Sequence, residues 1–222
     1  MWPFNRNRST EPIGSIDRYK KYRTTGTQLT QKMLDSPYGS ETSMEKAGRT
    51  LGIVQGKTFI FEQQEETIAL TDFLFFDYRQ EGQTLLERYT AEIGGSNSDE
   101  QVILKAWQSA YTSLFKVTQV STSESVITLS DVLNPGASIQ LMDLSFSKTA
   151  IPGVLFFTRI VPFDEFNTTS GCTFVFPETR EKHLMTKYKS LVKKVKTTDE
   201  RIQRFVCFFK LNRTYGMEVS YR

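Results

Sequence analysis

The chain has 222 residues, of which 38% are hydrophobic and 13% aromatic. A chain of this length and composition buries a sizeable core, which excludes a wholly disordered protein. No apolar run reaches the ~18 residues of a membrane-spanning helix, and the first residues lack the apolar stretch of a secretory signal, so we expect a cytoplasmic protein. One histidine and two distant cysteines leave little for a metal centre or a disulfide framework, and we expect no cofactor.

Charge is unevenly distributed along the chain. Residues 1–40, 41–177 and 178–222 carry net charges of +4, −8 and +7, which together give the formal net charge of +3. Basic ends of this kind attract nucleic acid, anionic lipid or an acidic protein surface, or the acidic body of the same chain. Simple solvation of the charges is the alternative.

We interpret residues 1–40 as a basic, partly extended N-terminal arm, because Arg, Thr, Ser, Gly and Pro dominate there without sustained periodicity. Trp2 and Phe4 lie close to Arg6 and Arg8 at its start. Aromatic residues beside cations are typical of a short interfacial anchor, so weak contact with a membrane surface is one possibility for this end. A frayed terminus is the other.

Helical spacing begins in the next segment. We predict a short helix near residues 43–51 that stops at Gly52, a brief strand at 58–61, and a buried helix that ends in "FLFFDY", residues 73–78. Thr84 is a candidate cap for another short helix. Ser98 and Gln101 form a capping-box pattern, and apolar residues follow at helical spacing as far as Leu114.

The acidic residues around "FLFFDY" raise the question of catalysis. Asp72 and Asp77 are five positions apart, about 140° around a helix, so on a regular helix they do not share a face as paired catalytic carboxylates would. We therefore expect Asp77 to close the turn after a buried helix, with Phe73 and Phe76 in the core.

Beyond Phe115 the pattern changes to five β-rich runs separated by short turn-prone segments. Short connections favour an antiparallel meander. We therefore expect an α+β fold: N-terminal helices, then a five-stranded antiparallel meander that forms a small sheet or partly open barrel, then C-terminal helices. The expected units are the arm at 1–40, the α+β domain at 41–177 and a basic helical extension at 178–222, packed on the domain.

The C-terminal extension holds the strongest candidates for an interaction surface. Its lysines and arginines alternate with apolar stripes on two predicted helices. The aromatic residues of both helices fall on the apolar stripes, which favours a core role for them over stacking on nucleic-acid bases. The candidate interaction residues, with the N-terminal aromatics, are Lys187, Lys189, Lys193, Lys194, Lys196, Arg201, Arg204, Trp2 and Phe4.

Four local patterns follow one another along the middle of the chain: an aromatic run ending in aspartate at 73–77, a "TLLERY" helix start at 84–89, an "SLFKV" strand entry at 113–117 and a "DVLNPG" turn at 131–136. Their order resembles an uncharacterised bacterial domain family that is sometimes found with SEC-C type zinc-binding tails. The resemblance covers about residues 44–177. The closely spaced cysteines and histidine of the tail are missing here, so the resemblance implies a domain but neither a metal nor an activity.

Enzyme signatures are missing from the sequence. It contains no phosphate-binding loop, dinucleotide-binding glycine motif or nucleophile elbow, and a Ser-His-Asp triad would have to use His183 on a lysine-rich segment. We therefore expect a non-enzymatic protein-interaction module, an adaptor or accessory subunit of a larger assembly. The alternative is a nucleic-acid-binding protein that uses the basic C-terminal helices, and an enzyme of unknown type is a third class.

Overall fold

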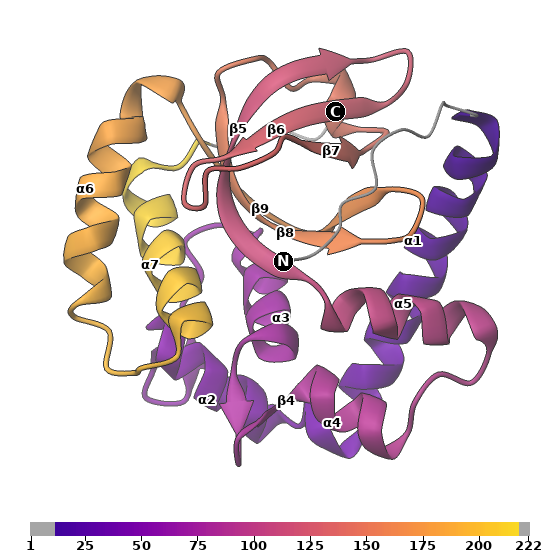
Figure 1. The fold of residues 1–222 in the computed structure, drawn as a ribbon. Coiled ribbons are helices and arrows are strands. Elements are labelled where there is room, and N and C mark those ends of the chain that lie inside the picture. Colours follow the sequence, from indigo (N-terminus) through magenta and orange to yellow (C-terminus); the bar gives the residue numbers. More distant parts are fainter. Residues whose placement is uncertain (1–11, 218–222) are drawn as a thin grey trace.

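The computed structural model describes residues 12–217 of the chain. A five-stranded barrel lies on a layer of helices, with further helices along two of its sides (Figure 1). This architecture confirms the predicted α+β class.

The barrel is built from all five predicted strand regions. The strands are β5 (Tyr111–Ser121), β6 (Val126–Asp131), β7 (Ile139–Met142), β8 (Leu155–Pro162) and β9 (Asn167–Phe176). The predicted antiparallel meander is wrong in one respect: β7 and β9 pair in parallel, so the strand order is β5-β6-β7-β9-β8 and the barrel is closed. Closure leaves no unpaired strand edge, which a meander would have exposed.

The path of the chain explains the parallel pair. After β7 the chain passes through a short 3-10 helix, η2 (Phe146–Lys148), before β8 pairs with β5 and β9 returns beside β7. Helix η2 thus lies between two strands of the barrel, so the prediction that all helices precede or follow the sheet is wrong. A five-stranded barrel with this order and one parallel contact between its third and fifth strands has the topology of an OB-type Greek-key barrel.

Strand β8 divides its side chains between the barrel interior and the helices outside. Phe156 and Ile160 belong to the barrel core, whereas Phe157, Arg159 and Val161 alternate with them and face outward, all buried. Phe157 stacks on Phe208 of the C-terminal helix with ring centroids 4.4 Å apart. The outward face of this single strand therefore anchors the surrounding helices.

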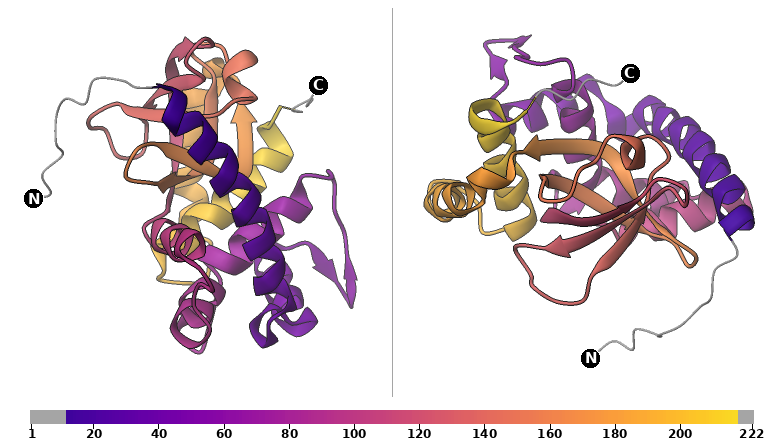
Figure 2. Two further views of the ribbon diagram at one scale, coloured as in Figure 1. Left: turned by 90° about the vertical axis from the view of Figure 1, so that its right-hand side faces the viewer. Right: turned by 90° about the horizontal axis from the view of Figure 1, so that it is seen from above.

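The N-terminal region differs from the predicted extended arm. Residues Pro12–Asp35 form helix α1, which runs from the barrel down to the helical layer (Figure 2). Tyr19, Leu29 and Met33 are buried along it, and Arg23 Nη1 donates a hydrogen bond to the Thr169 carbonyl oxygen, 2.9 Å away. Tertiary packing overrides the weak helical propensity of the Thr- and Gly-containing sequence. Residues 1–11 of the predicted arm lie outside the described residues.

The helical layer follows η1 (Pro37–Gly39) and contains α2 (Glu41–Leu51), α3 (Glu66–Phe76), α4 (Leu85–Glu92) and α5 (Ser98–Gln108), with two small hairpins. The hairpins pair β1 (Val54–Gln55) with β2 (Thr58–Phe59), and β3 (Arg79–Gln80) with β4 (Gln83–Thr84). Several predicted boundaries are confirmed: Gly52 ends α2 in the left-handed conformation, Asp77 is the C-cap of α3, and Thr84 caps α4 in a capping box with Glu87.

The helix predicted from Ser98 ends earlier than expected. Its N-cap is Asn97, and Tyr111 to Leu114, which continued the helical spacing, instead form the start of β5 and pair with β8. The barrel ladder supplies backbone hydrogen bonds that outweigh a continued helical period.

The chain ends in η3 (Glu178–Arg180), α6 (Glu181–Val192) and α7 (Glu200–Tyr215), which lie beside each other on one side of the barrel (Figure 1). Helix α7 contributes Phe205, Phe208 and Phe209 to the core. Within residues 12–217, no helix has the combined length and apolarity needed to cross a bilayer.

Candidate functional site

A buried ionic cluster lies where α3 meets the barrel. The guanidinium of Arg159 is fully buried and bonds to Asp72 and Asp77, whose side chains are 4% and 0% exposed. Nε and Nη2 of Arg159 donate to Asp72 Oδ1 at 3.0 and 2.7 Å, and Nη2 also donates to Asp77 Oδ2 at 2.5 Å. The same guanidinium lies over the ring of Phe76, 4.4 Å from its centroid.

The two aspartates meet because Asp77 is no longer helical. Its φ and ψ are −122° and −39°, which differ from those of the regular α3 helix that holds Asp72. The argument that the two carboxylates do not share a face applies to a regular helix only: in the structure both converge on one arginine. They do so through that arginine and not as a directly hydrogen-bonded acid/base pair.

Burial and charge act in opposite directions on these groups. Burial raises the pKa of Asp77 above its usual range, and the charge and hydrogen bonds of Arg159 offset only part of this effect. Burial acts to lower the pKa of Arg159, but the two carboxylates outweigh it and raise that pKa. The arginine therefore stays protonated and fixes both carboxylates, which is a structural arrangement and not a poised acid/base pair.

Arg159 was not predicted as a functional residue. In the sequence it interrupts the apolar run "VLFFTRIV", where Phe157, Arg159 and Val161 share one strand face. A lone arginine on the buried face of a strand needs acidic partners, and the two aspartates that flank the apolar run 73–76 are suitable ones. This combination of one arginine and two aspartates in apolar segments is the sequence pattern that could have predicted the buried cluster.

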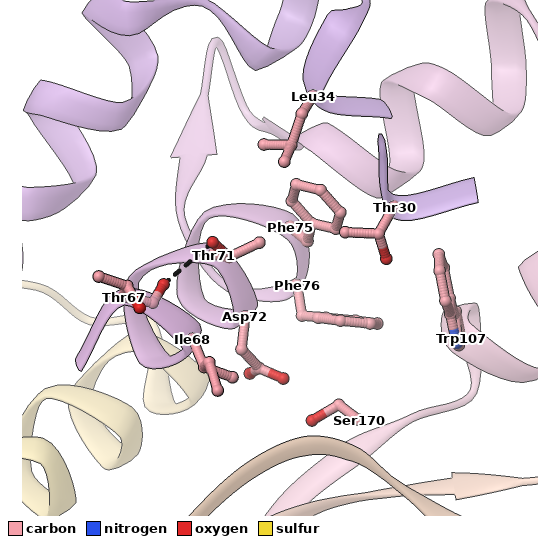
Figure 3. Close-up of a pocket in the computed structure, with 10 residues that line it drawn as sticks. All are labelled: Thr30, Leu34, Thr67, Ile68, Thr71, Asp72, Phe75, Phe76, Trp107 and Ser170. Atoms are coloured by element: carbon pink, nitrogen blue, oxygen red, sulfur yellow. Dashed lines mark hydrogen bonds between the residues drawn. The ribbon is translucent and has the colours of Figure 1, made fainter. Parts of the chain in front are cut away.

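A cavity of about 310 Å³ opens beside this cluster, between α1 and α3. Its apolar walls are Leu34, Ile68, Phe75, Phe76 and Trp107; its polar atoms come from Thr30, Thr67, Thr71, Asp72 and Ser170 (Figure 3). Asp72 contributes to the cavity lining, and its carboxylate oxygen that Arg159 does not bind has no hydrogen-bond partner. Sequence reasoning did not predict this cavity, because its walls are contributed by four separate elements.

The predicted lysines form a second candidate site. Lys187, Lys189, Lys193, Lys194 and Lys196 are all exposed on α6 and the turn that follows it, and no ion pair joins them to another residue within 12–217. We call these five residues the lysine face. Leu184 of α6 is completely buried, and Tyr188 stacks on Phe208 with ring centroids 5.0 Å apart, so the helix is firmly anchored.

The other predicted interaction residues differ from the lysine face. Arg201 donates to the Phe76 carbonyl oxygen and its Nε lies 3.4 Å from Asp77 Oδ1; Arg204 Nη1 donates to the Thr112 carbonyl oxygen at 2.7 Å. Both arginines thus bind within the molecule. Trp2 and Phe4 lie outside the described residues.

Potential metal ligands are dispersed over residues 12–217, and the single histidine packs against an aromatic ring. No group of three or more His, Cys, Asp or Glu side chains there is arranged to hold a metal ion. His183 is half-buried on α6, and its ring packs edge-on against Tyr215 at 4.9 Å. Cys172 and Cys207 are both buried.

Comparison with known proteins gives one match. Residues 14–222 match a family of unknown function, DUF7986, and the chain therefore belongs to this family. The match confirms a domain of an uncharacterised family and extends beyond both ends of the 44–177 region that carried the resemblance; a relation to bacterial proteins with SEC-C tails stays a prediction. No curated protein and no solved structure matched the chain.

Proposed function

We propose that this member of DUF7986 is a non-enzymatic protein-interaction module, an accessory subunit that binds an acidic protein surface through the lysine face. The observation that supports it is the set of five exposed lysines on the anchored helix α6 and in the turn after it, none of them in an ion pair with another described residue. Unpaired like charges that are concentrated in one short segment favour fast association with a surface of opposite charge.

The same lysines would also attract nucleic acid, but the aromatic residues nearby are not available for stacking on bases. Tyr188, Phe205 and Phe208 pack against one another or against barrel side chains. Sequence-tolerant binding of single strands depends on exposed aromatic platforms along a basic groove. The lysine face offers the charge without the platform, which favours a protein partner.

The barrel gives a second argument against nucleic acid. OB-type barrels bind oligonucleotides on their second and third strands and on the loops after the first and fourth. Here β6 and β7 contain no aromatic residue and no Lys or Arg. Phe163 and Phe166 of the β8–β9 loop pack against Tyr19 and Tyr22 of α1. A shared topology does not carry the function with it.

The test is a tagged pull-down from the native host at moderate salt, with and without nuclease, read by mass spectrometry. We would compare the wild type with Lys189→Glu/Lys193→Glu/Lys194→Glu and with a matched control, Lys46→Glu/Lys57→Glu/Lys105→Glu. The control lysines are equally exposed and lie on other helices and loops, so the two variants have the same net charge.

The proposal predicts a partner that survives nuclease, is retained by the control variant and is lost from the lysine-face variant. Partners that disappear with nuclease, together with a steep loss of binding to a labelled oligonucleotide as salt rises, would make the protein a nucleic-acid binder instead. Equal capture by both variants would show that the lysine face is not the interaction surface.

A further inference from the structure

The cavity beside the buried ionic cluster contains a carboxylate oxygen that has no partner. Asp72 is 5% exposed and its Oδ1 accepts from Arg159, but its Oδ2 has no hydrogen-bond partner in the structure. A buried carboxylate oxygen without a donor is costly, and native proteins rarely leave one unsatisfied. This oxygen therefore marks a place where a donor from outside the chain is expected.

The Asp72 side chain points toward the cavity that it helps to line (Figure 3). Figure 3 shows the Asp72 carboxylate extending into the cavity toward the Ser170 hydroxyl, with Phe76 and Trp107 on the adjoining side. No hydrogen bond joins Asp72 Oδ2 to Ser170 across this space. A donor group placed between the two would satisfy the carboxylate oxygen and reach the hydroxyl as well.

The charges around the cavity favour a cationic donor. Arg159 directs its bonded N–H groups at Asp72 Oδ1 and at Asp77, and Arg201 approaches Asp77, so no described cation contacts Asp72 Oδ2. A charged donor forms a shorter and stronger bond to a carboxylate than a neutral donor does. The aromatic walls add a favourable surface for a cation, and an anionic ligand would meet the carboxylate unfavourably.

The size and accessibility of the cavity suit a small molecule. Its volume of about 310 Å³ is at the lower end of known ligand pockets, and its lining is mostly apolar with a few polar atoms. Ile68, at its rim, is 48% exposed, so the cavity is reached from solvent between α1 and α3.

We propose that this cavity binds a small ligand that carries a protonated amine on an apolar body, with the ammonium group bonded to Asp72 Oδ2 and Ser170 and the body packed against Phe76 and Trp107. The site is separate from the lysine face on α6, so the inference does not depend on the proposed function.

The test uses benzylamine as the probe, with benzyl alcohol and benzoate as neutral and anionic probes of the same shape. Binding to the full chain is followed by NMR through the indole N–H signal of Trp107, which Trp2→Phe identifies because the chain has two tryptophans. We expect a saturable shift with benzylamine at a dissociation constant on the order of 1 mM, about tenfold weaker binding of benzyl alcohol, and no binding of benzoate.

Two variants locate the binding site. Asp72→Asn keeps an acceptor for Arg159 but removes the negative charge, and should weaken benzylamine binding about tenfold while changing benzyl alcohol binding little. Ile68→Lys places an ammonium group one helical turn before Asp72, where it competes for Oδ2, and should abolish binding. Its control is Ile93→Lys, at a similarly exposed position at the C-terminal end of α4.

The possible outcomes are distinct. Loss of binding in Ile68→Lys but not in Ile93→Lys supports the site even if Asp72→Asn does not fold. Equal binding of benzylamine and benzyl alcohol, retained binding in Ile68→Lys, or no saturable shift at all would overturn the proposal and leave a cavity that holds water only. The lysine-face variant should bind benzylamine as the wild type does, whatever its effect on a protein partner.

Discussion

The buried cluster around Arg159 and the lysine face on α6 place the same kind of side chain in opposite surroundings. Arg159 is completely buried and divides its hydrogen bonds between two carboxylates, whereas the five lysines are exposed and have no ion-pair partner within residues 12–217. A buried cation must be fully satisfied within the fold, because its desolvation is costly. An exposed cation is solvated by water and remains available to another molecule. The difference indicates that the first group serves the fold, and it supports the binding role proposed for the second.

The largest expected effect is that of Arg159→Met. This substitution leaves the buried Asp72 without a cation and Asp77 with only the partly exposed Arg201, and removal of one partner from a buried ion pair costs about 3–5 kcal/mol. Urea unfolding should show this loss in the free energy of unfolding. The loss should shrink as the pH is lowered, because burial already raises the pKa of Asp77 and the isolated carboxylates become neutral.

A matched variant separates charge from packing at the same place. Asp72→Leu/Asp77→Leu/Arg159→Met removes all three charges, and most of the stability lost in Arg159→Met should return, since apolar replacements of whole buried ion clusters are often neutral or stabilising. If the triple variant is as unstable as the single one, packing of the arginine stem and not its charge is what stabilises this region.

Asp77→Asn should have the second largest effect. The amide keeps the shape and one acceptor, but its NH2 group opposes a donor of Arg159, so we expect a loss of about 1–3 kcal/mol in the free energy of unfolding. Chemical denaturation measures it, with Asp164→Asn on the exposed β8–β9 loop as the control. An unchanged midpoint would mean that Asp72 alone holds Arg159.

An ion pair between α1 and α5 is intermediate between the buried cluster and the lysine face, because one of its two groups is buried and the other is exposed. Glu100 is 3% exposed and accepts from Lys32 Nζ at 2.7 Å, while Lys32 itself is largely exposed. The hydrogen bond from Lys32, together with that from the Ser96 backbone, lowers the pKa of Glu100 in the folded chain. The pair therefore contributes stability that is complete above the pKa of the unfolded chain and is lost as the pH falls through the folded pKa.

Glu100→Gln tests this dependence. The difference in unfolding free energy between wild type and variant should be constant near neutral pH and should decrease between about pH 5 and pH 3. Thermal or urea unfolding across this range measures the difference. A difference that stays constant down to pH 3 would show that the contribution of Glu100 does not depend on its charge.

The smallest effect on stability should come from the lysine face. Lys189→Gln/Lys193→Gln/Lys194→Gln should change the free energy of unfolding by less than about 0.5 kcal/mol per site, as surface substitutions without contacts usually do. Thermal unfolding at low and at high salt checks this expectation. A clear stabilisation at low salt would show that the lysines repel one another in the free protein, and would strengthen the contrast with Arg159.

The sequence predicted the individual helices and strands of this fold better than the way in which they pair and pack. The five strand regions, the end of α3 at Asp77 and the cap at Thr84 follow from local spacing and turn chemistry, and all were confirmed. The parallel contact between β7 and β9 could not be read from the chain, because short connections are equally compatible with a meander. The helix at α1 was missed because its stability comes from packing and not from propensity.

The same distinction applies to the candidate sites. The lysine face was predicted because its lysines lie outside the apolar stripe of α6 or in the short segment that follows this helix. The cluster of Asp72, Asp77 and Arg159 joins residues 82 and 87 positions apart, and depends on a non-helical turn at Asp77. Such long-range pairing is not contained in any local pattern of one sequence.

The distance along the chain between Asp72 and Arg159 also has a consequence for synthesis. A ribosome adds roughly 5–20 residues per second, so the 87 positions between them correspond to a delay on the order of 4–17 s. During this time α3 has emerged with its phenylalanines and both aspartates, but the strand that covers them has not yet been made. The nascent helix is therefore a transient exposed apolar segment, and Asp72 and Asp77 are among the few charges in or beside it until β8 has been made.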